Sequence, residues 1–210
     1  MAKKEIIKIN MPEFKMATIT IEGTTDLCLN KMNYGSKMNL PQNKSGKTKF
    51  IKSKWGDIVT SIHWKEGIDE AEIYYDADEE MMNKLLLKNA PCFTGFGLKK
   101  ACIATISRNN ISGTGTSFQQ TVNMLEDLIP IEFTTHYIRE VIASPKKGSP
   151  VISDVNMFSG WRATFSIEYS ETAYDFNSIL SIIQLAGFGG GIGSGRTSGY
   201  GRFHLVSTTS

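Results

Sequence analysis

The chain has 210 residues, of which 40% are hydrophobic and 10% aromatic, so it can build one core without disulfide or metal staples. Its three cysteines are widely spaced and form no CxxC pair, which argues against a disulfide framework and a zinc knuckle. No apolar stretch is long enough for a signal peptide or a membrane span. We therefore expect a cytoplasmic protein with no membrane contact, no metal and no cofactor.

The formal net charge is only +2, but the charges are unevenly placed. Residues 31–54 hold seven lysines and no acid, whereas residues 66–80 hold eight acids and no base. Two solvated surface loops would account for both segments. The alternative is a basic surface that meets phosphate groups, with an acidic surface that lies away from it or contacts a neighbouring subunit.

The first part of the chain begins with a strongly alternating segment. Residues Lys15 to Glu22 (KMATITIE) alternate with a period of two, which predicts a strand that ends at Gly23. Residues 24–90 are polar and lysine-rich, and we interpret them as an insertion lobe, because they hold few large apolar residues for a core of their own. Within the lobe we expect a strand at Asp57 to Trp64 and a helix at Glu79 to Lys88.

Two helices are expected after the insertion. Phe96 to Ser107 carries the apolar stripe of a helix, with glycines at its start. Ser117 is the expected cap of the second helix, since Gln120 completes a capping box three residues later. The apolar face of this helix runs from Phe118 to Ile129, and Pro130 ends it.

The last part of the chain contains strands and one helix. Ile131 to Ala143 and Trp161 to Tyr169 are expected strands, Asp175 and Gly187 the N-cap and C-cap of a helix, and Tyr200 to Val206 a final strand. Without the insertion and the extra helix the order is βαββαβ. The sequence thus predicts an α+β fold, a single domain with a ferredoxin-like, RRM-like core and a large lysine-rich insertion after the first strand.

A glycine-rich loop at residues 187–201 is the strongest functional candidate in the sequence. Its glycines can bring backbone N–H groups close to phosphate oxygens, its arginines have a forked geometry suited to phosphate, and its tyrosine offers a ring for base stacking. The alternative is a turn whose glycines only permit tight packing against the sheet. The residues that we expect to contact nucleic acid are Gly189, Gly191, Gly193, Arg196, Tyr200 and Arg202.

The insertion lobe supplies a second group of candidates. Lysines in its first half could bind phosphates, and two tryptophans beside them could stack on bases if they are exposed. The opposing interpretation is that the tryptophans attach the insertion to the main sheet. The residues in question are Lys44, Lys47, Lys49, Lys52, Lys54, Trp55 and Trp64.

Known phosphate-binding motifs and catalytic constellations do not fit. The glycine-rich loop follows a helix and opens a strand, the reverse of a dinucleotide fingerprint, and Pro41 breaks the Walker A spacing before Gly46-Lys47-Thr48. The three histidines share no metal-ligand spacing, and His63 alone could act near RNA as an acid or base. We therefore expect no enzymatic activity, with an RNA-processing endonuclease as the weakest alternative.

The segment from Trp161 to Phe203 resembles a family of bacteriophage proteins with the pattern W-x-A-x-F, AG, GIG, Arg and YGRF. That family is similar to the RAMP superfamily of CRISPR backbone proteins and nucleases, which have ferredoxin-like domains with a glycine-rich loop after the last helix. Weaker similarity covers Ile19 to Leu29 and Leu87 to Ala104. In the phage pattern an Arg-Pro often precedes the tryptophan strand, whereas this chain has SDVNMFSGW.

The resemblance implies a sequence-tolerant binder of single-stranded nucleic acid, with RNA favoured over DNA. Such a protein could assemble along its strand through head-to-tail self-association. The alternative is a phage-encoded interaction protein in the host cytoplasm that mimics or blocks a host CRISPR-type nucleoprotein complex.

Overall fold

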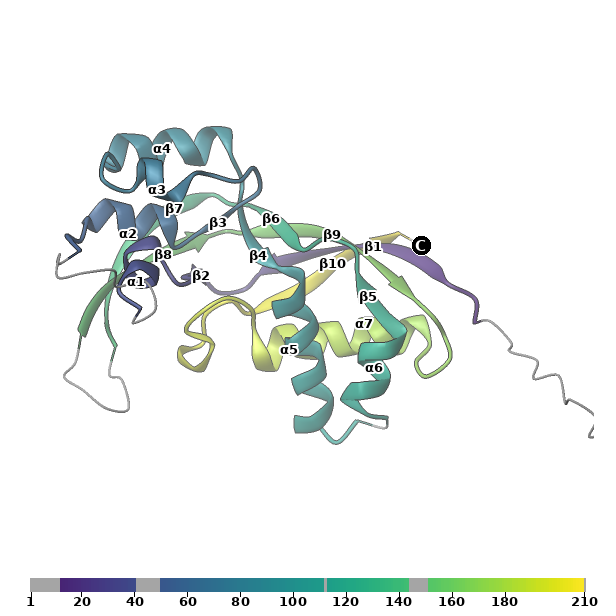
Figure 1. Cartoon of the computed structure of the whole chain (residues 1–210). Helices are drawn as coiled ribbons and strands as arrows, with labels where there is room; N and C mark the ends of the chain where they lie inside the picture. Colours follow the sequence, from purple (N-terminus) through teal and green to yellow (C-terminus); the bar gives the residue numbers. More distant parts are fainter. Residues whose placement is uncertain (1–11, 41–49, 112, 144–150, 210) are drawn as a thin grey trace, which may run out of the picture.

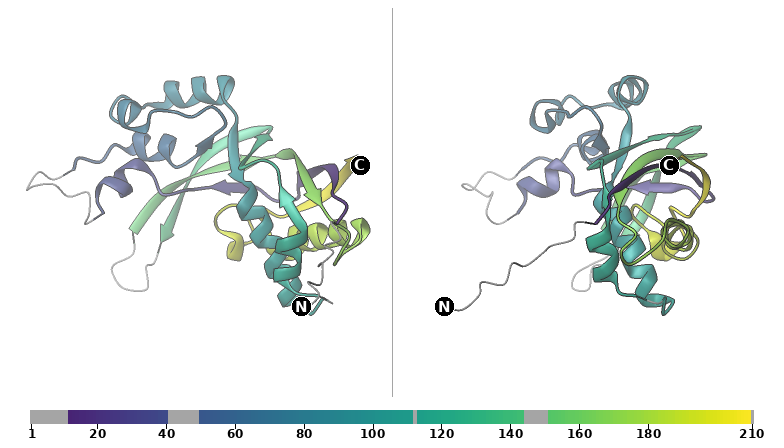
Figure 2. Two further views of the ribbon diagram at one scale, coloured as in Figure 1. Left: turned by 45° about the vertical axis from the view of Figure 1, so that its right-hand side comes forward. Right: turned by 90° about the vertical axis from the view of Figure 1, so that its right-hand side faces the viewer.

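A computed structural model describes residues 12–40, 50–111, 113–143 and 151–209. Four of its strands pair antiparallel in the order β10-β1-β9-β6, and helices α5, α6 and α7 lie on one face of this sheet (Figures 1 and 2). The elements of this core are β1 (Lys15–Gly23), α5 (Gly95–Arg108), β6 (Leu128–Glu132), β9 (Arg162–Tyr169), α7 (Phe176–Leu185) and β10 (Phe203–Thr209). Their chain order is βαββαβ, so the predicted ferredoxin-like α+β fold is confirmed.

Further strands widen this sheet to seven. β4 (Pro91–Thr94) and β3 (His63–Trp64) continue it beyond β6, and the short β5 (Val122–Met124) pairs with β9. A second, three-stranded sheet has the order β2-β8-β7. Its strands are β2 (Leu27–Leu29), β7 (Thr135–Ala143) and β8 (Val151–Ser159).

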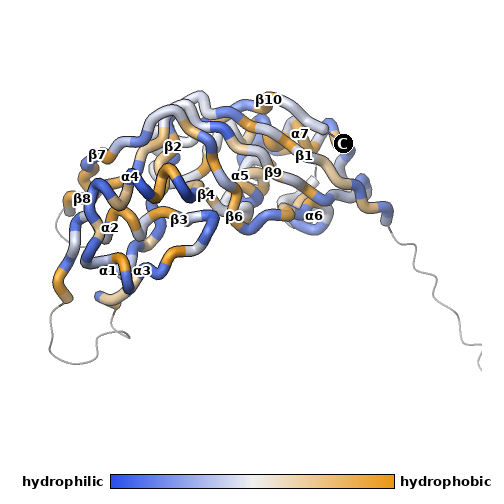
Figure 3. The backbone as a smooth tube through the Cα atoms, turned by 90° about the horizontal axis from the view of Figure 1, so that it is seen from above, coloured by the Kyte–Doolittle hydropathy of each residue, from blue (hydrophilic) through white to orange (hydrophobic). Residues whose placement is uncertain are grey.

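The insertion lobe is mainly helical and lies at one end of an elongated, arched body, away from β1 and β10 (Figure 3). Its buried Val59, Ile62 and Met82 belong to the same apolar cluster as the sheet residues. The lobe therefore packs onto the core of the main sheet. Its helices are α1 (Tyr34–Met38), α2 (Lys54–Thr60), α3 (Glu70–Ile73) and α4 (Glu79–Lys88).

The prediction of a strand from Asp57 to Trp64 is wrong. Its first half belongs to α2, because the Ser53 side chain accepts a hydrogen bond from the Gly56 N–H and caps the helix. Only His63–Trp64 pairs as a strand, with β4. The β-branched residues Ile58, Val59 and Thr60 are buried within this short helix, so their local strand propensity does not decide the structure.

The predicted second helix after the insertion is much shorter than expected. α6 (Gly115–Thr121) is capped by Thr114, whose hydroxyl accepts from the Ser117 N–H, and it ends where Val122 pairs with Tyr169 of β9. The segment up to Pro130 forms β5 and β6 instead. Pairing with β9 and β4 satisfies the backbone there, and tertiary contacts override the helical spacing of the apolar residues.

The segments around β9 and α7 follow the sequence pattern closely. Along β9 the residues from Ala163 to Tyr169 alternate between buried and more exposed, and Asp175 caps α7 by accepting from the Ser178 N–H. Gly187, however, is no C-cap: α7 continues into a π-helical turn, Ala186–Gly190. Gly187 is there because a Cβ would lie 2.2 Å from the Phe203 carbonyl oxygen.

The opposite face of the central strands carries hydroxyl groups. Thr20 on β1 and Thr164 on β9 hydrogen-bond at 3.0 Å, and Thr18 and Ser166 follow at 3.4 Å. An RRM-like aromatic stacking platform is therefore missing from this part of the described sheet. Among the described helices, none combines the length and apolar character that crossing a bilayer requires.

Candidate nucleic-acid interface

The glycine-rich loop is fixed onto the segment that follows β1. Ser194 N–H donates to the Cys28 carbonyl at 2.8 Å, and Gly201 N–H donates to the Asp26 carbonyl at 2.8 Å. The Thr25 hydroxyl donates to the Gly199 carbonyl at 2.9 Å. These bonds join residues more than 160 positions apart in sequence, because β10 and β1 are neighbours in the sheet. The loop is thus a defined surface rather than a free linker.

Most glycines of the loop are needed for packing or backbone conformation. Gly191 and Gly193 have φ values of 71° and 75°, in the left-handed region that favours glycine. A Cβ on Gly193 would lie 2.5 Å from the Cys28 carbonyl oxygen, and one on Gly191 2.8 Å from that of Tyr200. Gly189 differs, since its φ is not left-handed and a Cβ there would meet no atom within 4 Å. The packing interpretation therefore explains two of the three glycines expected at the site.

A cavity of about 230 Å³ lies between the loop, the start of α5 and the start of the insertion lobe. Three cationic side chains line it, Lys31, Lys100 and Arg196, together with His63. Its described lining contains no carboxylate. The volume is below that of a typical small-molecule pocket, which suits a compact anion such as one phosphate group of a longer chain.

Arg196 is the cation that the loop itself supplies. It begins a short 3₁₀ turn, Arg196–Ser198, after Gly195, whose φ is 65°. The side chain is exposed, and no hydrogen bond, ion pair or ring contact occupies it among the described residues. An arginine fixed at its backbone and without a partner there can form a two-pronged contact with a phosphate.

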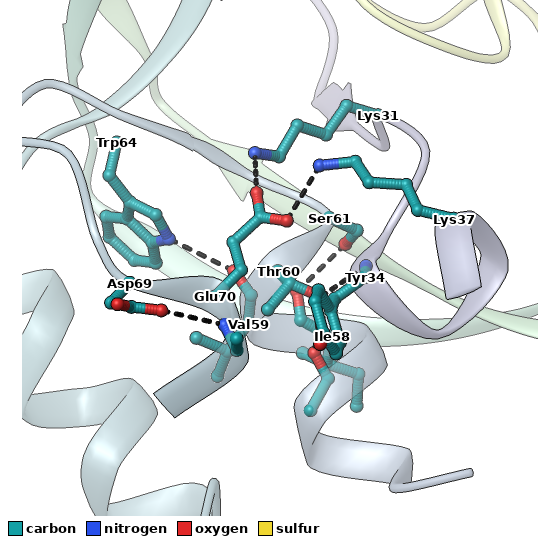
Figure 4. A network of polar contacts seen from close by, with 12 residues as sticks. Lys31, Tyr34, Lys37, Ile58, Val59, Thr60, Ser61, Trp64, Asp69 and Glu70 are labelled. Atoms are coloured by element: carbon teal, nitrogen blue, oxygen red, sulfur yellow. Dashed lines mark hydrogen bonds and ion pairs between the residues drawn. The ribbon is translucent and has the colours of Figure 1, made fainter. Parts of the chain in front are cut away.

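Lys31 reaches the cavity from the insertion lobe and is held by an acid (Figure 4). The Glu70 carboxylate accepts from Lys31 at 2.6 Å and from Lys37 at 2.7 Å. Burial alone would raise the pKa of Glu70, but the two lysine hydrogen bonds outweigh it and lower that pKa. One of the two interpretations of the charge pattern placed the acidic segment away from the basic one. Glu70 departs from it, because this acid pairs with two lysines of the basic segment.

His63 is a half-buried wall of the same cavity. Burial lowers its pKa, and the charges of Lys31 and Lys37 lower it further. The imidazole is consequently neutral at pH 7, where it can donate one hydrogen bond and accept another.

Helix α5 contributes its N-terminus to the cavity. The Thr94 hydroxyl caps the helix by accepting from the Gly97 N–H at 3.1 Å, and both residues line the cavity. The positive end of the helix dipole therefore adds to the charges of the side chains. One turn into the helix, the Lys100 ammonium lies 4.4 Å from the centroid of the Phe96 ring.

The other two candidate side chains of the loop have structural contacts. Arg202 donates from Nη1 to the Phe188 carbonyl at 2.8 Å, which braces the π-helical turn. The Tyr200 ring is half-buried against the Val155 and Met157 cluster, with the Arg139 guanidinium 5.5 Å from its centroid. Neither side chain lines the cavity.

The candidates from the insertion lobe do not converge on the cavity. Lys52 and Lys54 are exposed, and Lys54 forms an ion pair with Asp154 at 3.4 Å. Trp55 is half-buried against the core. Trp64 is only 3% exposed and donates to the Val59 carbonyl at 3.0 Å, so the expectation that it stacks on bases is wrong. Three further candidates, Lys44, Lys47 and Lys49, lie outside the described residues.

Sequence reasoning did not single out Lys31, Lys100 or His63 as a group. Lys31 was one of seven lysines in the basic segment, and Lys100 lies on an ordinary helix. Only the pairing of β3 with β4 and the closure of the loop onto β2 bring them together. The one available signal was the weaker family similarity over Ile19 to Leu29, which ends two residues before Lys31.

Comparisons with known proteins find distant structural likeness only. No known protein family and no curated protein matches the sequence. The cryo-EM structure of Type III-B Cmr-beta bound to cognate target RNA superposes with a TM-score of 0.49 and 13% identity, over 93% of this chain and 60% of that chain. The crystal structure of Cmr6 from Pyrococcus furiosus gives a TM-score of 0.38 and 9% identity, over 92% and 98%. At these scores the likenesses define neither a family nor a function.

Proposed function

We propose that the chain binds single-stranded nucleic acid with little sequence preference, and that a backbone phosphate occupies the cavity beside the glycine-rich loop. The observation that carries the proposal is the convergence of Arg196, Lys31 and Lys100 on a small cavity whose described lining has no carboxylate. Contacts to phosphate contribute affinity without reading bases, which explains the expected tolerance of sequence. The preference for RNA rests on the sequence resemblance to RAMP proteins.

The electrostatics of the cavity favour an anion over a neutral ligand. Lys31 is partly neutralised by Glu70, whereas the described residues around Lys100 and Arg196 provide no acid within ion-pair distance. The N-terminus of α5 adds a partial positive charge at the same place. A phosphate in the cavity would thus contact Lys100 and Arg196, which have no acidic partner among the described residues, and Lys31, whose charge is shared with Glu70.

Binding at two salt concentrations tests the proposal. Fluorescence anisotropy with labelled single-stranded RNA and DNA oligonucleotides should show affinity that falls as salt rises, because counterions are released from the strand. Absence of binding to both at low salt would overturn it. Binding to a host protein complex without affinity for free nucleic acid would favour the phage-encoded interaction protein instead, and a pull-down with and without nuclease separates the two.

The proposal extends to assembly along the strand. The acids of residues 66–80 other than Glu70, such as Glu72, Asp76 and Glu80, are exposed and could face the basic surface of the next copy. A head-to-tail contact of this kind is open-ended. Mass photometry with oligonucleotides of increasing length should show stepwise addition of protomers, and a single stoichiometry at every length would contradict assembly.

We further propose that the chain does not cleave its ligand. His63 lies beside Lys31 in the cavity, but among the described residues no cluster of three metal-ligating side chains accompanies it. Incubation of labelled RNA with and without EDTA should leave the RNA intact. Cleavage that is lost in His63→Gln would make the cavity a nuclease site.

A further inference from the structure

An exposed phenylalanine at the edge of the cavity has no structural role in the core. Phe96 is 65% exposed, although it belongs to a helix whose buried face is formed by Leu98, Ala101 and Cys102. A single exposed apolar side chain is common on protein surfaces, but this one lies in the chain between Thr94 and Gly97, which both line the cavity. Phe96 was expected only as the first residue of a helix, and the proposed phosphate site does not account for it.

The surroundings of Phe96 keep its ring accessible. Glycines precede and follow it, so neighbouring side chains in the chain cannot cover the ring. Gly95 is fixed in place, because a Cβ there would lie 2.2 Å from the Glu126 carbonyl oxygen, and Gly97 lines the cavity. The ring is therefore held at the first turn of α5, beside residues that line the cavity.

Lys100 connects the ring to the cavity. Its ammonium lies 4.4 Å from the Phe96 ring centroid and also lines the cavity. A cation at this distance is attracted to the ring face and limits the rotamers of both side chains. A ligand with a phosphate in the cavity and an aromatic group beside it would contact Lys100 and Phe96 together.

We infer that Phe96 stacks on an unpaired nucleobase whose adjoining phosphate lies in the cavity. This inference deepens the proposed function and depends on it. Stacking on an aromatic side chain does not distinguish one base from another, because every base has a π face, so it agrees with sequence-tolerant binding. It also assigns the base contact to α5 instead of Tyr200, whose ring is half-buried.

A comparison of normal and abasic strands tests the stacking separately from phosphate binding. The probes are a fluorescein-labelled single-stranded RNA of mixed sequence and a ribose-phosphate oligomer of equal length without bases, each titrated at low salt. Phe96→Ala should weaken binding of the RNA by about 5- to 150-fold and leave the abasic strand unaffected. Phe96→Tyr should bind like the parent, since it keeps the ring.

Matched controls distinguish failure of the stacking inference from failure of the proposed function. Phe14→Ala removes another exposed ring, 56% exposed and located before β1, and should leave binding to both strands unchanged. The thermal midpoint of Phe96→Ala should match that of the parent, because the ring is not part of the core. If the parent binds both strands and Phe96→Ala binds RNA equally well, the stacking inference is wrong while the phosphate site stands. If the parent binds neither strand, the proposed function itself fails.

Discussion

Reversal of the charge at Arg196 is the sharpest perturbation of the proposed phosphate site. In the parent the side chain is exposed and unoccupied among the described residues, so Arg196→Glu should leave the thermal midpoint unchanged. At a separation of about 4 Å a pair of unit charges interacts by about 1 kcal/mol in bulk water and about 4 kcal/mol near a protein surface. The reversal removes an attraction and adds a repulsion. Even the lower figure gives about 2 kcal/mol in total, or roughly 30-fold weaker binding at low salt.

The assay is fluorescence anisotropy with single-stranded RNA over a series of salt concentrations. Replacement of Arg196 by alanine should flatten the dependence of log affinity on log salt by about 0.7, the value for one lost contact on a single strand. Arg108→Glu is the matched control, because it makes the same charge change at the last residue of α5, while the cavity lies at the first turn. If Arg196→Glu binds as tightly as the parent at low salt, the loop is a structural turn and the site assignment is refuted.

Two further predictions concern stability. Trp64→Ala should lower the free energy of unfolding by about 3 to 5 kcal/mol, because it empties a buried site and removes the hydrogen bond to Val59; a loss below about 1 kcal/mol in urea denaturation would contradict its place in the core. Burial lowers the pKa of both His63 and His136 below the ordinary 6.5, so the unfolded chain binds more protons than the folded one as pH falls. Stability should therefore decline below about pH 6.5, and a double His63→Gln, His136→Gln variant should decline less over the same range in urea midpoints at pH 7.5 and 5.5.

The elements that could be predicted from sequence are those in which local signals and tertiary contacts agree. β1 and β9 are central strands with one buried face, so their period of two follows directly from the burial. The start of α7 was visible because Asp175 caps it and an apolar stripe follows. The ferredoxin-like order also needs α5, which the apolar stripe from Phe96 to Ser107 predicted, and β6, which the sequence placed inside a longer expected strand that starts at Ile131.

The elements that could not be predicted are those that depend on partners distant in the chain. The segment from Val122 to Ile129 has helical spacing, yet it forms β5 and the start of β6 because β9 and β4 offer backbone partners. The β8 strand was missed, since its buried residues Asn156 and Phe158 follow contacts with α2 and β7 rather than a regular pattern. Pairing partners of this kind are not encoded in any local window.

The residues of the candidate site also differ in whether a local sequence signal could reveal them. Arg196 was found because a cluster of glycines around an arginine is unusual in sequence, whereas Lys31 and Lys100 look like any surface lysine. Their convergence depends on β1 lying beside β10 and on the loop pairing with Cys28. Composition left two roles open for the tryptophans of the lobe, stacking on bases or attachment to the sheet; Trp55 is half-buried and Trp64 buried, which agrees with attachment.

The glycines of the loop provide a final test of what the loop is for. At Gly193 alanine would face left-handed strain and a clash with the Cys28 carbonyl oxygen, so Gly193→Ala should destabilise the fold by about 1 to 3 kcal/mol. At Gly189 neither backbone nor neighbours require glycine, and alanine should fit without loss or even add up to about 1 kcal/mol of stability. The absence of a side chain at Gly189 leaves its backbone open to close approach by a ligand.

We therefore expect Gly189→Ala to keep its urea midpoint or raise it, and yet to bind single-stranded RNA more weakly than the parent. If the loop were only a structural turn, a variant with unchanged or higher stability would bind RNA as well as the parent. Weaker binding without loss of stability therefore points to a direct contact. Gly193→Ala is the internal comparison, since its affinity and stability should fall together as the cavity wall moves. Unchanged affinity in Gly189→Ala would mean that the ligand does not approach the π-helical turn, and would confine the contact to Arg196 and the cavity.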